Sequence, residues 1–222
     1  MTSSMHRVLL LAAAVVLLSG CVTTTVDELI FNEPTEGIGE STVVILGRRH
    51  GSDQGTEPDF ITCVGKHISK RDKSIVVTGE VDFLNSLYPW FEPRTAPLSL
   101  VDLKKLIRRE PVARRMAELN TRYIIWIGGS TERVDSGGSM SCTIGPGGGG
   151  CFGFAYWSDE ANYEAVIWDF ADQAEVGRVN TTAFGQSYIP AIIIPIPLIA
   201  PVQGTACNGI GDKLLKFLSG KY

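Results

Sequence analysis

The start of the chain constrains the fold most, because its first twenty residues have the features of a segment that is removed. A short beginning that ends in His6 and Arg7 is followed by an uninterrupted apolar run, residues 8–18. A membrane-spanning helix needs about 20 apolar residues, so this run is too short for one. A basic start before a short apolar run is typical of a secretory leader. We therefore expect residues 1–20 to be a signal peptide, which leaves 202 of the 222 residues to fold.

The expected leader ends in Leu18-Ser19-Gly20-Cys21. This tetrapeptide resembles the lipobox of bacterial lipoproteins. The resemblance implies that Cys21 becomes the first mature residue and carries acyl chains such as palmitate, which anchor the protein to a membrane. Val22 is not the aspartate that implies inner-membrane retention in enterobacterial lipoproteins, so the resemblance favours the outer membrane, facing the periplasm. The alternative is an ordinary leader with a chance cysteine.

The composition is that of a folded protein with an acidic balance. Hydrophobic residues make up 44% and charged residues 20%, which favours a globular body over a disordered chain. The net charge is −4, and loss of Arg7 with the leader makes it more negative. An acidic body disfavours nonspecific binding to nucleic acid, so we expect no nucleic-acid partner.

The mature chain is expected to have two parts. Residues 21–41 contain Pro34, Gly37 and Gly39, which interrupt any regular pattern, and we expect a flexible tether there. Residues 42–222 are expected to form a single α/β domain, because about 180 residues can bury one core.

Three apolar runs predict strands in the first half of this domain, at residues 42–46, 74–81 and 122–127. In the second of these strands, Glu80 and Asp82 would point to the same face, since side chains alternate along a strand. Two carboxylates on one face suit acid/base chemistry, but the solvent-exposed end of a strand explains them equally well.

Helices are predicted between these strands. Thr56 would cap a helix that has Pro58 in its first turn. Ser99, followed three residues later by Asp102, resembles a capping box that opens a helix to about Arg109. A further helix is expected from Pro111, because proline suits the first turn of a helix.

The second half has a different pattern. Residues 152–157, 164–169 and 175–184 are expected to form antiparallel strands, the last entered through a turn that contains Gln173. Residues 189–202 are strongly apolar but contain four prolines, which forbid a membrane helix. Residues 210–218 are expected to form a closing helix.

This order predicts an α/β (α+β) fold. We expect a single three-layer or two-layer domain with a mixed sheet flanked by helices: strand-helix-strand-helix-strand, then antiparallel strands and a C-terminal helix. The order, with the patterns 123–128 and 166–169, resembles the α/β domain shared by curli-secretion lipoproteins, the N-terminal domain of the Tol propeller protein and activators of penicillin-binding proteins. The long hairpin segments of the curli channel are not evident in the sequence, so pore formation is not expected.

The remaining cysteines support export. Without Cys21, an even number is left, which is consistent with two disulfides in an oxidising periplasm. Three connectivities are open; we prefer Cys142 with Cys151, which bracket a glycine-rich loop, and then Cys63 with Cys207. A zinc site is the alternative, but the chain has no CxxC pair and the ligand spacing is poor, so we expect no metal.

The loop after the first predicted strand contains the best candidates for binding chemistry. Loops at this place in α/β sheets often carry function, and arginines bind phosphates, carboxylates or acidic partners. The candidate residues are Arg48, Arg49, His50 and Asp53. The competing interpretation, which we favour, is a solvated loop whose arginines pair with nearby acids. His67, on an apolar helix face, is expected to be a partly buried packing residue.

Two other segments resemble contact surfaces. Trp90, Phe91 and Arg94 lie among prolines and are residue types favoured as interface anchors. The segment 192–199 would be an apolar patch for a partner or a membrane if exposed. If buried, it completes the core, and the sequence favours burial.

These features together predict an envelope lipoprotein that is a nonenzymatic binding or assembly module, without catalytic residues or cofactors. We expect an envelope protein partner, and the sequence leaves an oligomer open. One alternative is a periplasmic enzyme that uses the Arg48 loop on cell-wall or phosphorylated substrates. Another is a structural lipoprotein that self-associates through its apolar stretch.

Overall fold

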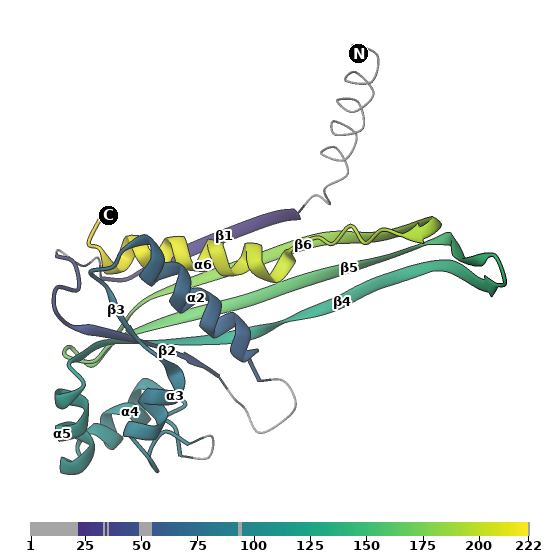
Figure 1. Ribbon diagram of the computed structural model, residues 1–222. Coiled ribbons are helices and arrows are strands. Elements are labelled where there is room, and N and C mark those ends of the chain that lie inside the picture. Colours follow the sequence, from purple (N-terminus) through teal and green to yellow (C-terminus); the bar gives the residue numbers. More distant parts are fainter. Residues whose placement is uncertain (1–21, 33, 35, 49–54, 93–94, 222) are drawn as a thin grey trace. The chain divides into compact units, whose positions relative to one another are not determined.

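The computed structural model describes residues 22–32, 34, 36–48, 55–92 and 95–221 (Figure 1). The sheet has six strands in the order β1-β6-β5-β4-β2-β3. In chain order the elements are β1 (Val22–Ile30), β2 (Thr42–Gly47), α2 (Pro58–Arg71), β3 (Val76–Thr78), α3 (Glu80–Ser86), α4 (Leu100–Ile107), α5 (Glu110–Glu118), β4 (Thr121–Gly145), β5 (Gly148–Asp169), β6 (Ala174–Pro195) and α6 (Val202–Leu218).

The sheet is mixed, as the sequence predicted. Strand β2 pairs in parallel with both β3 and β4. Short turns connect β4 to β5 and β5 to β6, and neighbouring strands joined in this way are antiparallel. Strand β1 is antiparallel to β6, because Thr23 bonds to Phe184 while Phe31 bonds to Val176. The α/β fold class with a mixed sheet and flanking helices is therefore confirmed.

The chain divides into two compact units. The strand unit contains residues 131–160 and 183–202, together with the chain before Thr24. The helical unit contains residues 24–130, 161–182 and 203–222. Strands β4, β5 and β6 each contribute residues to both units.

Within the helical unit, helices cover both faces of the sheet. Ile124 and Trp126 of β4 belong to a buried cluster with apolar residues of α3, α4 and α5. Tyr123, which points to the other face, contacts Phe217 of α6 with a ring-centroid distance of 5.2 Å. Helix α2 lies on that same face, where its Phe60 stacks on Tyr163. The alternation along β4 thus serves two apolar cores, which explains its continuous apolar run.

The predicted helices of the first half are present. Ser99 caps α4: its hydroxyl accepts a hydrogen bond from the Asp102 backbone N–H at 3.2 Å and donates one to the Asp102 carboxylate at 2.7 Å. Pro58 lies in the first turn of α2, as expected. The predicted cap of α2 was wrong, because Glu57 occupies that position. Thr56 instead donates its hydroxyl hydrogen to the Ile127 carbonyl oxygen at 2.9 Å, so it ties the start of α2 to β4.

The predicted strand at residues 74–81 was partly wrong. Only Val76–Thr78 form β3, and Glu80 begins α3. Glu80 and Asp82 therefore lie in the first turn of a helix, where carboxylates are favoured by the helix dipole. They do not share one face of a strand.

The strands of the second half are longer than the sequence predicted. The segments 152–157 and 164–169 belong to one strand, β5, and β4 continues well beyond residue 127. The two strands form a long hairpin that was not evident from the sequence. Gly129 allows close approach within it: φ is 128°, and a Cβ there would lie 2.0 Å from the Asn162 carbonyl oxygen. Helix α6 also begins earlier than expected, at Val202.

Strand β1 occupies part of the segment expected to be a tether. Residues 22–30 are rich in valine and threonine, whose branched side chains favour strands. Pro34, Gly37 and Gly39, the residues that predicted a tether, all lie after this strand.

Candidate interaction surface

The chain that follows the expected lipid attachment site is fixed to β6. Cys21 lies outside the described residues, and Val22 begins β1. The Thr23 hydroxyl donates a hydrogen bond to the Phe184 carbonyl oxygen at 3.4 Å. Beside it, a Cβ on Gly185 would lie 3.2 Å from a methyl carbon of Val22. The described residues that directly follow Cys21, Val22 and Thr23, therefore belong to the strand unit.

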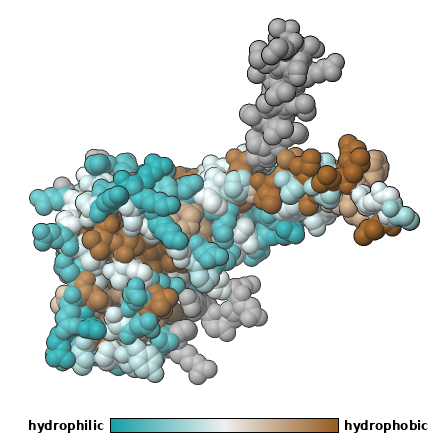
Figure 2. Space-filling model, in the orientation of Figure 1, coloured by the Kyte–Doolittle hydropathy of each residue, from teal (hydrophilic) through white to brown (hydrophobic). Residues whose placement is uncertain are grey.

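The strand unit exposes many large apolar side chains. Ile192, Ile193 and Ile194 have 78%, 68% and 70% of their surface accessible. The expectation that segment 192–199 is buried was wrong. Figure 2 shows apolar residues concentrated along β6 and the chain that follows it. We define the apolar surface by its exposed members: Ile144, Phe152, Phe154, Phe184, Ile192, Ile193, Ile194, Ile196 and Ile199.

The exposed isoleucines are held in place by an ordered backbone. Tyr188 and Leu198 form an antiparallel bridge, with N–H to oxygen distances of 2.9 and 2.8 Å. The Ile196 N–H donates to the Pro190 carbonyl oxygen at 3.0 Å, inside the turn that this bridge closes. Ile193 has φ 88°, a conformation that a β-branched residue rarely adopts. Local hydrogen bonds thus hold these side chains toward solvent.

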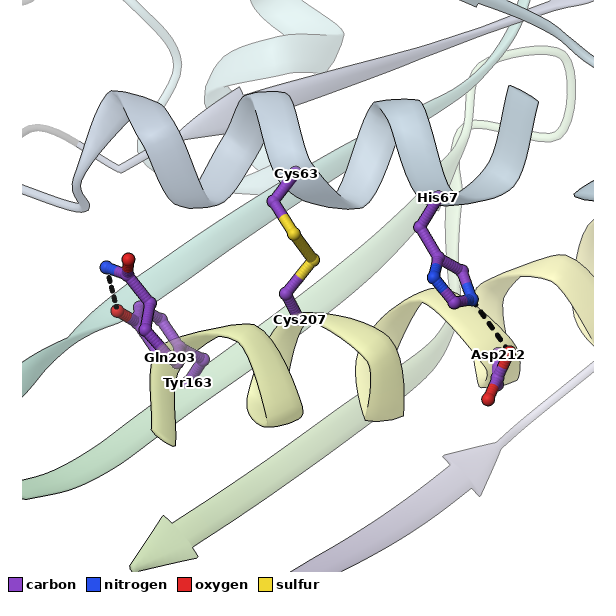
Figure 3. Close-up of a disulfide and its surroundings, with 6 residues drawn as sticks. All are labelled: Cys63, His67, Tyr163, Gln203, Cys207 and Asp212. Atoms are coloured by element: carbon purple, nitrogen blue, oxygen red, sulfur yellow. Dashed lines mark hydrogen bonds and ion pairs between the residues drawn. A yellow bond between two sulfur atoms is a disulfide. The ribbon is translucent and has the colours of Figure 1, made fainter. Parts of the chain in front are cut away.

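Two disulfides stabilise the fold, and they are the two pairs preferred from the sequence. Cys142 and Cys151 join β4 to β5 across the glycine-rich turn, with a Cα–Cα distance of 4.0 Å. Cys63 and Cys207 join α2 to α6, as Figure 3 shows.

The histidine on α2 has a structural role. His67 Nε2 lies 2.7 Å from the Asp212 carboxylate of α6, and the His67 side chain is only 10% exposed (Figure 3). Gly211 lies directly beneath the ring, where a Cβ would be 2.6 Å from a ring carbon. The interpretation of His67 as a partly buried packing residue is therefore confirmed, and its ring is also hydrogen-bonded to Asp212.

Of the candidate loop residues, the structure describes Arg48. It follows β2, and its backbone N–H donates to the Ile127 carbonyl oxygen at 2.7 Å. Its guanidinium forms no ion pair with the other described residues. The other candidates, Arg49, His50, Asp53 and Arg94, lie outside the described residues.

The aromatic candidates belong to the core. Phe91 is 2% exposed and meets Phe83 edge to face, with ring centroids 5.1 Å apart. Trp90 is partly buried against the same cluster. Phe91 therefore packs in the buried cluster between β2 and helices α3, α4 and α5, and it is not an exposed anchor for a partner.

A cavity of about 140 Å³ lies at the carboxyl end of β2 in the helical unit. Its wall includes Arg48, Glu80 and Glu92 with the rings of Trp126 and Trp168. Sequence reasoning found Arg48 but missed the two tryptophans. The available signal was that Trp126 and Trp168 both lie in predicted strands, at residues 122–127 and 164–169.

The described residues contain neither a metal-binding cluster nor a membrane-spanning helix. Across the described ranges, no group of three or more histidine, cysteine, aspartate or glutamate side chains could hold a metal ion. None of the helices in this part of the chain is long and apolar enough to cross a membrane.

Among the solved structures that are similar to this chain are two of the PelC dodecamer from Paraburkholderia phytofirmans. One is 13% identical, with a TM-score of 0.43. The other, the L103M form, is 11% identical, with a TM-score of 0.40. Each match covers 90% of this chain and all of the PelC chain. No protein-family model and no curated protein matches the sequence. A structural likeness of this size carries no conclusion about function.

Proposed function

We propose that this protein is an outer-membrane lipoprotein, anchored through acylated Cys21 and facing the periplasm. In this proposal it is a nonenzymatic binding or assembly module, and its apolar surface contacts another component of the envelope. The observation that carries the proposal is the exposure of the apolar surface in the same unit as the residues that follow Cys21.

The size of the apolar surface argues for a contact. Burying one isoleucine side chain contributes about 1.5–3 kcal/mol, so several exposed isoleucines represent a large driving force for association. Proteins that function alone rarely expose a contiguous patch of this kind. The ordered backbone around Ile193 adds to the argument, because little backbone freedom is lost when a partner binds.

The two disulfides support the proposed compartment. Disulfides form and persist in the periplasm and are rare in the bacterial cytosol. Cys63 with Cys207 and Cys142 with Cys151 use four cysteines and leave Cys21 for acylation.

The binding role is tested by photo-crosslinking in intact cells. A photoreactive residue would replace Ile192 or Ile194 in the full-length protein. The control position is Val101 of α4, which is also an exposed aliphatic residue, 61% accessible, but lies in the helical unit. We expect a covalent adduct with a second envelope protein from Ile192 and Ile194, and none from Val101. An adduct between two copies of this chain would instead favour the self-associating structural lipoprotein. Labelling of lipid alone would contradict the binding role.

The anchor is tested by the intact mass of protein extracted from membranes. We expect the mass of acyl chains on the chain that begins at Cys21, and their loss in a Cys21→Ser variant. Reduction should add four hydrogens, two for each disulfide. An unlipidated chain from the membrane fraction would overturn the anchor.

A further inference from the structure

The cavity at the carboxyl end of β2 has features of a ligand site that the apolar surface does not share. It lies beside the parallel strands β2 and β4, and ligands of α/β proteins commonly bind at the carboxyl ends of such strands. We propose that it binds a small zwitterion with an apolar body, of the chemical class of the hydrophobic α-amino acids.

Two hydrogen-bond donors in the wall lack acceptors among the described residues. Trp126 is 7% exposed, and its buried indole Nε1–H has no partner in the described structure. A buried donor without an acceptor is unfavourable, and native proteins rarely leave one. The Arg48 guanidinium is also without an ion pair there. A carboxylate in the cavity would accept from the Arg48 guanidinium and lie beside the Trp126 ring.

The acidic residues of the wall oppose a ligand that is only an anion. Glu80 and Glu92 both line the cavity together with Arg48, so carboxylates as well as a guanidinium face the ligand. Glu80 Oε1 already accepts a hydrogen bond from the Gly47 N–H at 2.9 Å, which fixes its position at the end of β2. Glu92 forms no ion pair with another described residue, so its carboxylate can receive an ammonium group. The carboxylate of a zwitterion therefore pairs with Arg48, and its ammonium group pairs with Glu92.

The rest of the wall is apolar and fits a short side chain. The rings of Trp126 and Trp168 are tilted by 60° with centroids 5.9 Å apart, and Leu84 and Leu98 also line the cavity. Apolar cavities of about 150 Å³ accept a benzene-sized molecule. The volume of about 140 Å³ thus admits a branched aliphatic or single-ring group.

The proposal is tested by calorimetric titration of the detergent-solubilised full-length protein with three related probes. L-leucine carries both charges, isocaproate lacks the ammonium, and isoamylamine lacks the carboxylate. We expect L-leucine to bind at least about tenfold more tightly than either of the others, because each lost charge leaves a wall group unpaired. Equal affinities, or no heat with millimolar L-leucine, would overturn the proposal.

Variants then test which side chain of the cavity wall binds the carboxylate of the ligand and which binds its ammonium group. Arg48→Gln should weaken L-leucine and isocaproate about tenfold and leave isoamylamine unchanged, whereas Glu92→Gln should weaken L-leucine and isoamylamine only. Arg114→Gln, an exposed change on α5, is the matched control and should have no effect. The melting temperature of each variant shows whether it is folded, and a folded Arg48→Gln protein with unchanged L-leucine affinity would contradict the proposal.

Discussion

At the scale of single residues, Asp169 depends on Arg122. The Asp169 side chain is 2% exposed, and Arg122 donates to its Oδ2 through Nε at 2.9 Å and lies 2.7 Å away through a second nitrogen. Burial lowers the pKa of Arg122, but the hydrogen bond and charge of Asp169 outweigh this and raise it. We expect Arg122→Gln to cost about 1.5–3 kcal/mol of unfolding free energy, because the buried Asp169 carboxylate loses its charged partner and keeps only the Asp172 backbone N–H. Urea denaturation measures this loss. Arg114→Gln, which breaks an exposed pair with Glu110, should cost less than about 1 kcal/mol; equal losses would show that Asp169 does not need its partner.

The capping box of α4 makes a prediction about pH. The hydrogen bond from the Ser99 hydroxyl lowers the pKa of Asp102. A carboxyl group whose pKa is lowered by folding stabilises the fold above its unfolded pKa, and this contribution is lost as the pH falls through the folded pKa. We expect Ser99→Ala to raise the pKa of Asp102 toward its ordinary value. NMR titration of the Asp102 carboxyl carbon checks this, and an unchanged midpoint would mean that Ser99 does not hold the carboxylate.

At the scale of elements, the two disulfides differ in what they constrain. Cys63 and Cys207 are 144 residues apart in sequence, whereas Cys142 and Cys151 are 9 apart. The loss of unfolded-chain entropy grows with loop length, to about 5 kcal/mol for the long loop and about 3 kcal/mol for the short one. We therefore expect the double variant Cys63→Ser/Cys207→Ser to lose more unfolding free energy than the double variant Cys142→Ser/Cys151→Ser. Urea midpoints of the two double variants provide the comparison, and a larger loss from the hairpin pair would contradict the entropic account.

The elements also show what could be predicted from the sequence. The cap that Ser99 forms with Asp102 was predictable, because it depends on hydrogen bonds between residues that are only three apart in the sequence. The long hairpin of β4 and β5 was not, since its exposed residues show no sustained apolar alternation and the strand is held by hydrogen bonds to its neighbour. The cavity was missed for a related reason: Arg48, Trp126 and Trp168 meet only when three strands align.

At the scale of the whole molecule, the apolar surface and the core make different contributions to folding. Side chains that are already in water contribute little to folding, so their replacement should not destabilise the chain. We expect the triple variant Ile192→Ser/Ile194→Ser/Ile196→Ser to change the unfolding free energy by no more than about 0.5 kcal/mol. The matched control is Ile125→Ala in the helical unit, which is fully buried and should cost about 2–5 kcal/mol.

The same triple variant should lose association while it keeps its fold, because about 1.5–3 kcal/mol of driving force disappears with each isoleucine that a partner buries. Native electrophoresis of detergent extracts, run beside the urea titration, measures both properties on one sample. We expect the unaltered protein to migrate as a larger complex than the triple variant does. Folded Ile125→Ala protein should migrate with the unaltered protein. If the triple variant were as destabilised as Ile125→Ala, the isoleucines would belong to the protein's own core, and the apolar surface could not be the site that binds another envelope component.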